Sequence, residues 1–235
     1  MMIQAYPKAF DSHELTKPAP RLQIGSHMLG SAIMVILMGL VAQSTYLRLE
    51  QMVIHPEQAN LLDYLAEFGS FCFASLICVL CVIRLKPSKQ AKGVIPVLAA
   101  LGGSFLLTAV NLAPVADLSP TVKSVAVCLL AIGNLLSVFC LAHLGRSFSI
   151  LPQARKLVTS GPYGLVRHPL YVAECIAALG LILLHLSPQS LITGTILLVV
   201  QMQRVIYEER VLMAAFPDYA DYAANVPRFI PVKRR

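Results

Sequence analysis

Six long apolar runs dominate this sequence and limit what the chain can fold into. They cover residues 25–47, 61–83, 94–113, 122–144, 170–186 and 190–207. A helix of roughly 20 apolar residues can cross a bilayer, because the helix bonds its own backbone polar groups where no water is present. With 57% hydrophobic and 13% charged residues, the chain also lacks the polar surface that a soluble protein of its length needs. We therefore predict an all-α, polytopic membrane protein with about six transmembrane helices.

The distribution of basic residues predicts the orientation. Six spans place both termini on one side of the membrane, and that side would then hold all Lys and Arg residues except Arg48 and Lys123, which is 17 of 19. Because Lys and Arg are retained in the cytoplasm far more readily than they are translocated, we expect both termini to be cytoplasmic. Short external loops and a pI near 9.2 favour a bacterial inner membrane. The positive charge is thus a topology signal, membrane lipids are the expected surroundings, and no nucleic-acid-binding motif is present.

The polar connection after the fourth run divides the chain into unequal parts. We predict a cytoplasmic segment over 1–24, a four-helix transmembrane scaffold over 25–144, and a functional region over 145–235. The connection holds Arg, Lys, His, Tyr, Gly and Pro in close succession, and long connections of this kind are usually functional or disordered. Pro169 suits the first turn of the next helix and holds His168 at the helix entrance. After that helix, Ser187 is a suitable cap for the last one, so the two form a tight hairpin.

Ionisable side chains gather at the cytoplasmic end of this hairpin. The group consists of His168, Tyr171, Glu174, Arg204, Glu208 and Glu209. Charged groups at membrane depth are costly and usually functional. Two plainer interpretations stay open: Glu174 as the ion-pair partner of Arg204 or Arg167, and the two consecutive glutamates as a solvated helix end.

Two sequence blocks resemble a known family. They are SGPYGLVRHPLY and, after the hairpin, RVIYEERVLMAAFPDYADYAANVPRFIP. Together they hold an R-H-P-x-Y motif, an R-x-x-x-E-E motif and then a tyrosine pair before a terminal proline. In order and separation they resemble the isoprenylcysteine carboxyl methyltransferases, integral membrane enzymes, over residues 141–231. The four earlier runs carry no part of this resemblance.

The resemblance implies that S-adenosylmethionine binds in a cytoplasmic cap at the ends of the last helices, in a pocket that is not a Rossmann fold. By match of motif, His168 and Tyr171 hold the methionine end of the cofactor, and Glu208 and Glu209 contact its polar groups. The adenine is framed by loop residues, namely Leu157, Val158, Gly161 and Tyr163. The acceptor of the methyl group is lipophilic and enters from the bilayer.

Four residues are candidates for catalysis. Arg204 either orients Glu208 or binds an acceptor carboxylate. Glu174 follows a position where family members often have Gly, so its extra carboxylate bears on acceptor choice, and Arg228 is assigned to the acceptor. The acceptor itself stays open among a prenylated cysteine-like carboxylate, a lipid amine and a thiol. No metal site is predicted, because the histidines are dispersed, and the sequence leaves the oligomeric state open.

Two other functions compete with methyl transfer. Sterol reductases share a similar C-terminal architecture, and a reductase dependent on NADPH would use Arg155, Lys156 and Arg167 to bind the 2′-phosphate. A non-enzymatic membrane scaffold is the second alternative, and it predicts that His168 and Glu208 tolerate replacement. A transporter is disfavoured because the sequence shows no internal repeat.

Overall fold

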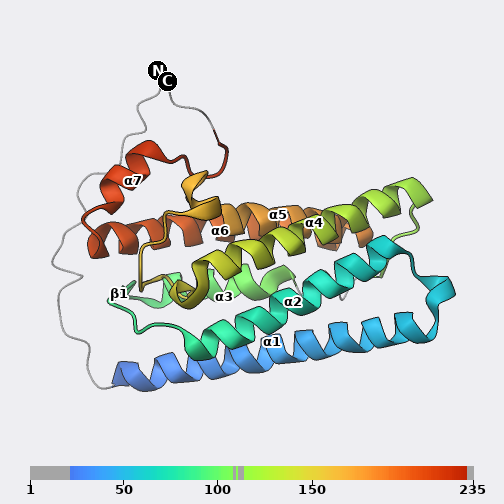
Figure 1. Cartoon of the computed structure of the whole chain (residues 1–235), viewed down its shortest axis with the longest axis horizontal. Helices are drawn as coiled ribbons and strands as arrows, with labels where there is room; N and C mark the ends of the chain where they lie inside the picture. The colour runs from blue at the N-terminus through green and yellow to red at the C-terminus, as the bar shows by residue number, and fades with distance from the viewer. Residues whose placement is uncertain (1–21, 108–109, 111–113, 232–235) are drawn as a thin grey trace.

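A computed structural model describes residues 22–107, 110 and 114–231 of the chain. In this part, α-helices lie side by side in a bundle, and a short two-stranded ribbon and α7 sit at one end of it (Figure 1). The helices are α1 (Leu22–Ile54), α2 (Leu61–Ile83), α3 (Val94–Phe105), α4 (Pro120–Leu144), α5 (Pro169–Leu184), α6 (Pro188–Ala215) and α7 (Tyr219–Asn225). The strands are β1 (Lys89–Gln90) and β2 (Gln153–Ala154), and three single helical turns are η2 (Pro56–Gln58), η4 (Gly145–Ser147) and η5 (Gly161–Gly164).

The all-α, polytopic architecture is confirmed. Among the described residues, four helices are long and apolar enough to cross a membrane: α1, α2, α4 and α6. The other two apolar helices, α3 and α5, have 12 and 16 residues. At 1.5 Å per residue, α5 is about 24 Å long, which is less than the roughly 30 Å of the hydrocarbon core.

Local signals in the sequence set most helix ends. The α2 bounds match the prediction, and Pro169 begins α5 with His168 as its N-cap residue. Ser187 caps α6 by accepting a hydrogen bond from the Ser190 backbone. Helix α1 continues to Ile54, beyond the predicted end. Helix α3 ends at Phe105, earlier than predicted, and much of its predicted remainder lies outside the described residues, as do 1–21 of the predicted N-terminal segment.

Glycines let α4 and α5 approach each other closely. A Cβ atom added at Gly133 of α4 would lie 2.3 Å from the backbone nitrogen of Ala177, and one added at Gly180 of α5 would lie 2.5 Å from the carbonyl oxygen of Ala126. Real Cβ atoms do not make contacts this short, so both positions need glycine. This tight packing fixes the place of α5, which carries Tyr171 and Glu174, relative to α4.

A backbone ribbon anchors the long connection between α4 and α5. Strands β1 and β2 pair antiparallel, with Lys89 opposite Ala154 and Gln90 opposite Gln153. The pairing is extended by backbone hydrogen bonds from Ser88 to the Ala154 carbonyl and from Ala91 to the Pro152 carbonyl. The connection is therefore ordered, and the ribbon holds it at the end of the bundle where α6 finishes (Figure 1).

Candidate functional site

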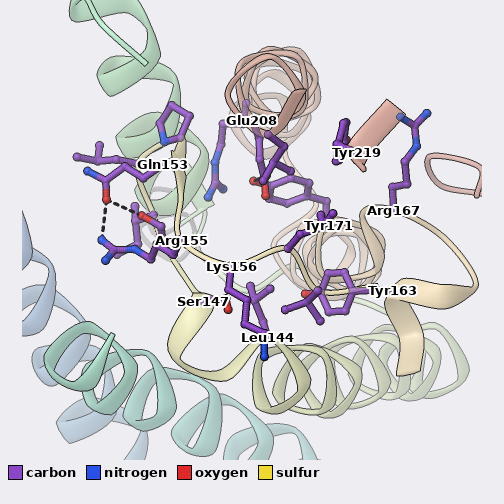
Figure 2. Close-up of a pocket in the computed structure, with 18 of the residues that line it drawn as sticks. Leu144, Ser147, Gln153, Arg155, Lys156, Tyr163, Arg167, Tyr171, Glu208 and Tyr219 are labelled. Atoms are coloured by element: carbon purple, nitrogen blue, oxygen red, sulfur yellow. Dashed lines mark hydrogen bonds between the residues drawn. The ribbon is translucent and has the colours of Figure 1, made fainter. Parts of the chain in front are cut away.

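A polar cavity opens where this anchored connection meets the ends of α5, α6 and α7. It holds about 710 Å³ of empty space, counting its open mouth. The connection forms one wall, and the helices form the opposite one (Figure 2). The charged and aromatic residues of the lining are Arg155, Lys156, Tyr163, Arg167, Tyr171, Arg204, Glu208, Tyr219 and Tyr222.

A hydrogen bond between α5 and α6 positions the acidic group of this cavity. The Tyr171 hydroxyl donates to Oε2 of Glu208 over 2.7 Å. The His168 ring stacks on the Tyr171 ring, with ring centroids 5.6 Å apart. Glu208 is part-buried, so its carboxylate is held in the cavity and not in bulk solvent. A fixed carboxylate of this kind can bind an ammonium group.

Two arginines in the lining have unused buried donors. Both belong to the connection, but they lie on opposite sides of the cavity, with Arg167 next to Tyr219 (Figure 2). The Nε atoms of both arginines and the Tyr219 hydroxyl are buried and have no hydrogen-bond partner among the described residues. Burial lowers the pKa of Arg155 to about 10, so the group is still a cation at neutral pH. Buried donors are rarely left unpaired, and these therefore fit a ligand that carries a carboxylate or other acceptor atoms.

Tyrosines form the aromatic part of the lining. Tyr222 of α7 donates a hydrogen bond of 2.6 Å to the Tyr163 carbonyl and so ties α7 to η5. Burial raises the pKa of Tyr163 well above its ordinary value and that of Tyr222 to about 12, so both phenols stay neutral. The rings of Tyr219 and Tyr222 meet edge to face at 5.9 Å. Aromatic faces of this kind suit a nucleobase or a cation.

A second, mainly apolar cavity lies inside the helix bundle and meets the first. It holds about 600 Å³ of empty space, again counting its mouth. Its apolar lining consists of Met34, Met38, Ile77, Leu107, Phe148, Ile150, Cys175 and Leu197, and its polar lining includes Ser104, Glu174, Gln201 and Arg204. Arg204 and Ile150 line both cavities. The molecule therefore places a polar chamber and an apolar chamber on two sides of one arginine.

Arg204 is held by its neighbours on α5 and α6. Its Nη1 donates to Oε1 of Gln201 over 2.9 Å and lies 3.9 Å from Oε2 of Glu174. Its guanidinium also sits 4.9 Å above the Tyr171 ring. The interpretation of Glu174 as an ion-pair partner of Arg204 is thus correct. The direct contacts of Arg204 are with Glu174 and Gln201, and the hydrogen bond that orients Glu208 comes from Tyr171.

Glu209 is the centre of a separate ionic cluster. Its side chain is buried and lies 2.8 Å from Nη1 of Arg167, 3.2 Å from Nε2 of His168 and 2.6 Å from Nη2 of Arg228. The Arg167 contact is close but lies off the N–H direction, so it is an ion pair and not a hydrogen bond. Backbone hydrogen bonds from residues 167 and 168 to the carbonyls of Pro227 and Arg228 extend the cluster. Glu209 therefore fastens the C-terminal tail to the entrance of α5.

Comparisons with known proteins match the part of the chain that builds the polar cavity. Residues 122–218 match the model of the phospholipid methyltransferase family. The protein-S-isoprenylcysteine O-methyltransferase of Schizosaccharomyces pombe is 36% identical over 110 residues, which are 44% of this chain and 47% of that protein. This C-terminal region is isoprenylcysteine methyltransferase-like.

Other relatives are similar over part of the chain. The Arabidopsis thaliana protein-S-isoprenylcysteine O-methyltransferase B is 32% identical over 110 residues, 44% of this chain and 56% of that protein. The cobalt-zinc-cadmium resistance protein CzcN of Cupriavidus metallidurans is 42% identical over 76 residues, 32% of this chain and 35% of that protein. The matches thus span about a third to a half of the length of these curated relatives.

Within the methyltransferase-like region, the structure separates the predicted site residues into three groups. Leu157, Val158, Tyr163, Tyr171 and Glu208 line the polar cavity, with Arg204 at its junction with the apolar cavity. Glu174 lines the apolar cavity. The remaining four residues lie outside both linings: Gly161, His168, Glu209 and Arg228.

Each residue of the third group has structural contacts of its own. His168, Glu209 and Arg228 form the ionic cluster. Gly161 has a φ of +59° and packs against His143, where a Cβ atom would lie 2.4 Å from the ring. The positive φ explains why this position holds glycine.

The sequence missed part of the cavity wall. Residues 147 and 149–153 line the cavity but contain no recognisable motif, and the long-range pairing of β1 with β2 holds this segment there. The family resemblance includes the pair Tyr219 and Tyr222 but assigns it no role. Their spacing of three residues on a short helix puts both on one face, and this signal was available in the sequence.

Proposed function

We propose that the protein transfers a methyl group from S-adenosylmethionine to a lipophilic, membrane-partitioned acceptor at the cytoplasmic face of the membrane, in a bacterial inner membrane with both termini inside. The observation that carries this proposal is the junction at Arg204, where the polar cavity meets an apolar one inside the helix bundle. A water-soluble cofactor and a membrane-soluble acceptor need chambers of these two kinds. The family match over 122–218 supports the same reaction class.

The residues of the polar cavity fit the groups that the cofactor carries. The Glu208 carboxylate suits its ammonium, the unpaired donors of Arg155 and Arg167 suit its carboxylate, and the tyrosines suit its adenine and sulfonium. When bound, the cofactor supplies an electrophilic methyl group. The protein then needs mainly to position two reactants and to exclude water, which are large contributions to rate in a direct displacement.

The distribution of charge supports the proposed orientation. The structure brings the end of α2, the start of α3, the end of α4, the start of α5 and the end of α6 to one end of the bundle, where the polar cavity lies (Figure 1). Most Lys and Arg residues of the described chain follow or precede these helix ends. A basic end of this kind faces the cytoplasm under the positive-inside rule.

A transfer assay tests the proposal. Purified protein in lipid nanodiscs receives S-adenosylmethionine with a labelled methyl group and a lipid extract, and the label is then measured in organic and aqueous fractions. We expect label in the organic fraction, a decrease of at least tenfold in Glu208→Gln, and no decrease in Glu50→Gln. Glu50 is the matched control because it is exposed on α1, far along the chain from the site. Label in neither fraction, or oxidation of NADPH by the same sample, would contradict the proposal and favour the reductase.

A further inference from the structure

Glu174 occupies a position that bears directly on the chemistry of the acceptor. It is on the first turns of α5, lines the apolar cavity, and lies next to Arg204, which borders both cavities. Gln201 Nε2 at 2.8 Å and Arg204 Nη1 at 3.9 Å both contact its Oε2 atom. The carboxylate is thus held in place through one oxygen in the lining of the mainly apolar cavity.

The two carboxylates of the site lie on opposite sides of Arg204. Glu208 lines the polar cavity and accepts the Tyr171 hydrogen bond, whereas Glu174 lines the apolar cavity and accepts the Gln201 hydrogen bond. A cation in the polar cavity would therefore meet Glu208, and the head group of a molecule in the apolar cavity would meet Glu174. Each chamber has its own acidic group.

The charges around Glu174 disfavour an anionic head group. Among the described residues that line the apolar cavity, the charged side chains are Glu174 and Arg204, which already pair with each other. Nη1 of Arg204 is further engaged by Gln201 Oε1. An acceptor carboxylate would add a second negative charge beside Glu174, and the described lining residues hold no cation besides Arg204 to balance it. Like charges at short range in a low-dielectric site repel strongly.

We propose that the acceptor is a lipophilic molecule whose nucleophilic atom carries a proton, a thiol or an amine and not a carboxylate, and that Glu174 takes up this proton. The inference rests on the proposed methyl transfer. In the step, the acceptor atom forms a bond to the methyl carbon while the bond from that carbon to the sulfonium sulfur breaks, and its electron pair stays on sulfur. The proton of the acceptor passes to the Glu174 carboxylate. Gln201 and Arg204 hold that carboxylate in position by the contacts described above.

The test compares three probes with the same twelve-carbon chain: dodecanethiol, dodecylamine and dodecanoate. Protein in nanodiscs of neutral lipid is assayed with each probe, as wild type, Glu174→Gln and the control Glu50→Gln. Mass spectrometry measures the methylated product. Calorimetry measures S-adenosylmethionine affinity in the same samples, and thermal shift without cofactor measures stabilisation by each probe.

The inference predicts a change in selectivity and not a general loss. Wild type should methylate the thiol or the amine at least tenfold faster than dodecanoate. Glu174→Gln should lose at least tenfold with that probe, should be stabilised more by dodecanoate than wild type is, and should keep its cofactor affinity within about twofold. A merely structural role for Glu174 would lower all three rates in parallel.

Two outcomes separate this inference from the function on which it rests. If wild type binds the cofactor and methylates dodecanoate preferentially, and Glu174→Gln leaves that preference unchanged, the inference is wrong and methyl transfer stands. If wild type binds no S-adenosylmethionine, the proposed function itself fails. Glu174→Asp, which keeps the charge but shortens the side chain, should restore part of the thiol or amine rate.

Discussion

Tyr171 of α5 donates a 2.7 Å hydrogen bond to Glu208 of α6 inside the polar cavity. This bond joins the two arms of the C-terminal hairpin at the level where the polar and apolar cavities meet. It also gives the site an acidic group of fixed position, which the proposed cofactor needs for its ammonium. The first prediction therefore concerns this hydroxyl.

Tyr171→Phe removes the hydroxyl and keeps the ring under Arg204. Hydrogen bonds to charged groups contribute about 1.5–3 kcal/mol, so we expect S-adenosylmethionine to bind about tenfold more weakly, as measured by calorimetry. Tyr46→Phe is the matched control, because Tyr46 is exposed on α1. Equal affinities for the wild type and the Tyr171→Phe protein would show that this bond does not shape the binding site.

Glu209→Gln tests the ionic cluster that fastens the C-terminal tail. The variant leaves two arginines and a histidine around a neutral amide, and removing one partner of a buried ion pair costs about 3–5 kcal/mol. We expect the midpoint of thermal unfolding in detergent to fall by several degrees. Arg228→Gln should have a smaller effect, because 34% of the Arg228 side chain is exposed and water screens its charge. A larger effect at Arg228 than at Glu209 would contradict this description.

Gly103→Ala tests whether Arg204 needs its present position. A Cβ atom at residue 103 would lie 2.5 Å from Cδ of Arg204 and 2.7 Å from Oε1 of Gln201, so both side chains would have to move. We expect methyl transfer to fall at least tenfold. Gly39→Ala on α1 is the matched control, since a Cβ atom there meets nothing within 4 Å. If both alanine variants keep full activity, Arg204 does not have to lie at the junction for transfer.

Tyr222→Phe removes the hydrogen bond that ties α7 to the Tyr163 carbonyl. A neutral hydrogen bond contributes about 1 kcal/mol, so we expect cofactor affinity to weaken about fivefold. Trypsin should also cut the connection after Arg155 or Lys156 more quickly than in the wild type. Unchanged cleavage would show that α7 does not hold this wall of the cavity.

The Tyr222 phenol also predicts a pH dependence. Burial raises its pKa to about 12, above the ordinary value of about 10. Between these two values the unfolded chain has lost the proton and the folded chain keeps it, so stability falls as pH rises from about 10 to about 12. The free energy of unfolding of Tyr222→Phe should fall less than that of the wild type over this range, and an equal fall would contradict the burial of this phenol.

Local signals in the sequence predicted the helices well where an end is set by its own residues. The Asn60 cap begins α2, Ser187 caps α6 and Pro169 begins α5. The end of α3 was not predictable in this way, because its apolar run continues past Phe105 without a glycine or proline before Pro114. The length of an apolar helix decides whether it can span the membrane, and that length depends on where the helix ends.

The sequence predicted many residues of the candidate site, but it did not predict how they are divided between the two cavities and the ionic cluster. The predicted hairpin places Tyr171, Glu174, Arg204, Glu208 and Glu209 at one end. The first four line the two adjoining cavities, whereas Glu209 lies in the separate ionic cluster. Which chamber each one faces depends on the rotation of α6, where successive residues differ by about 100°. It also depends on the tail that docks on Glu209 and on the β1–β2 pairing. These are contacts between segments far apart in the chain, and no local pattern encodes them.

Binding of S-adenosylmethionine to the purified protein tests the central claim most directly. Calorimetry in detergent compares the wild type with Glu208→Gln and with the control Glu50→Gln, while thermal unfolding shows that all three are folded. The proposed function predicts micromolar binding by the wild type and the control, and loss of at least tenfold in Glu208→Gln. A folded wild-type protein that binds no S-adenosylmethionine, or binds it equally well without the Glu208 carboxylate, would contradict the account.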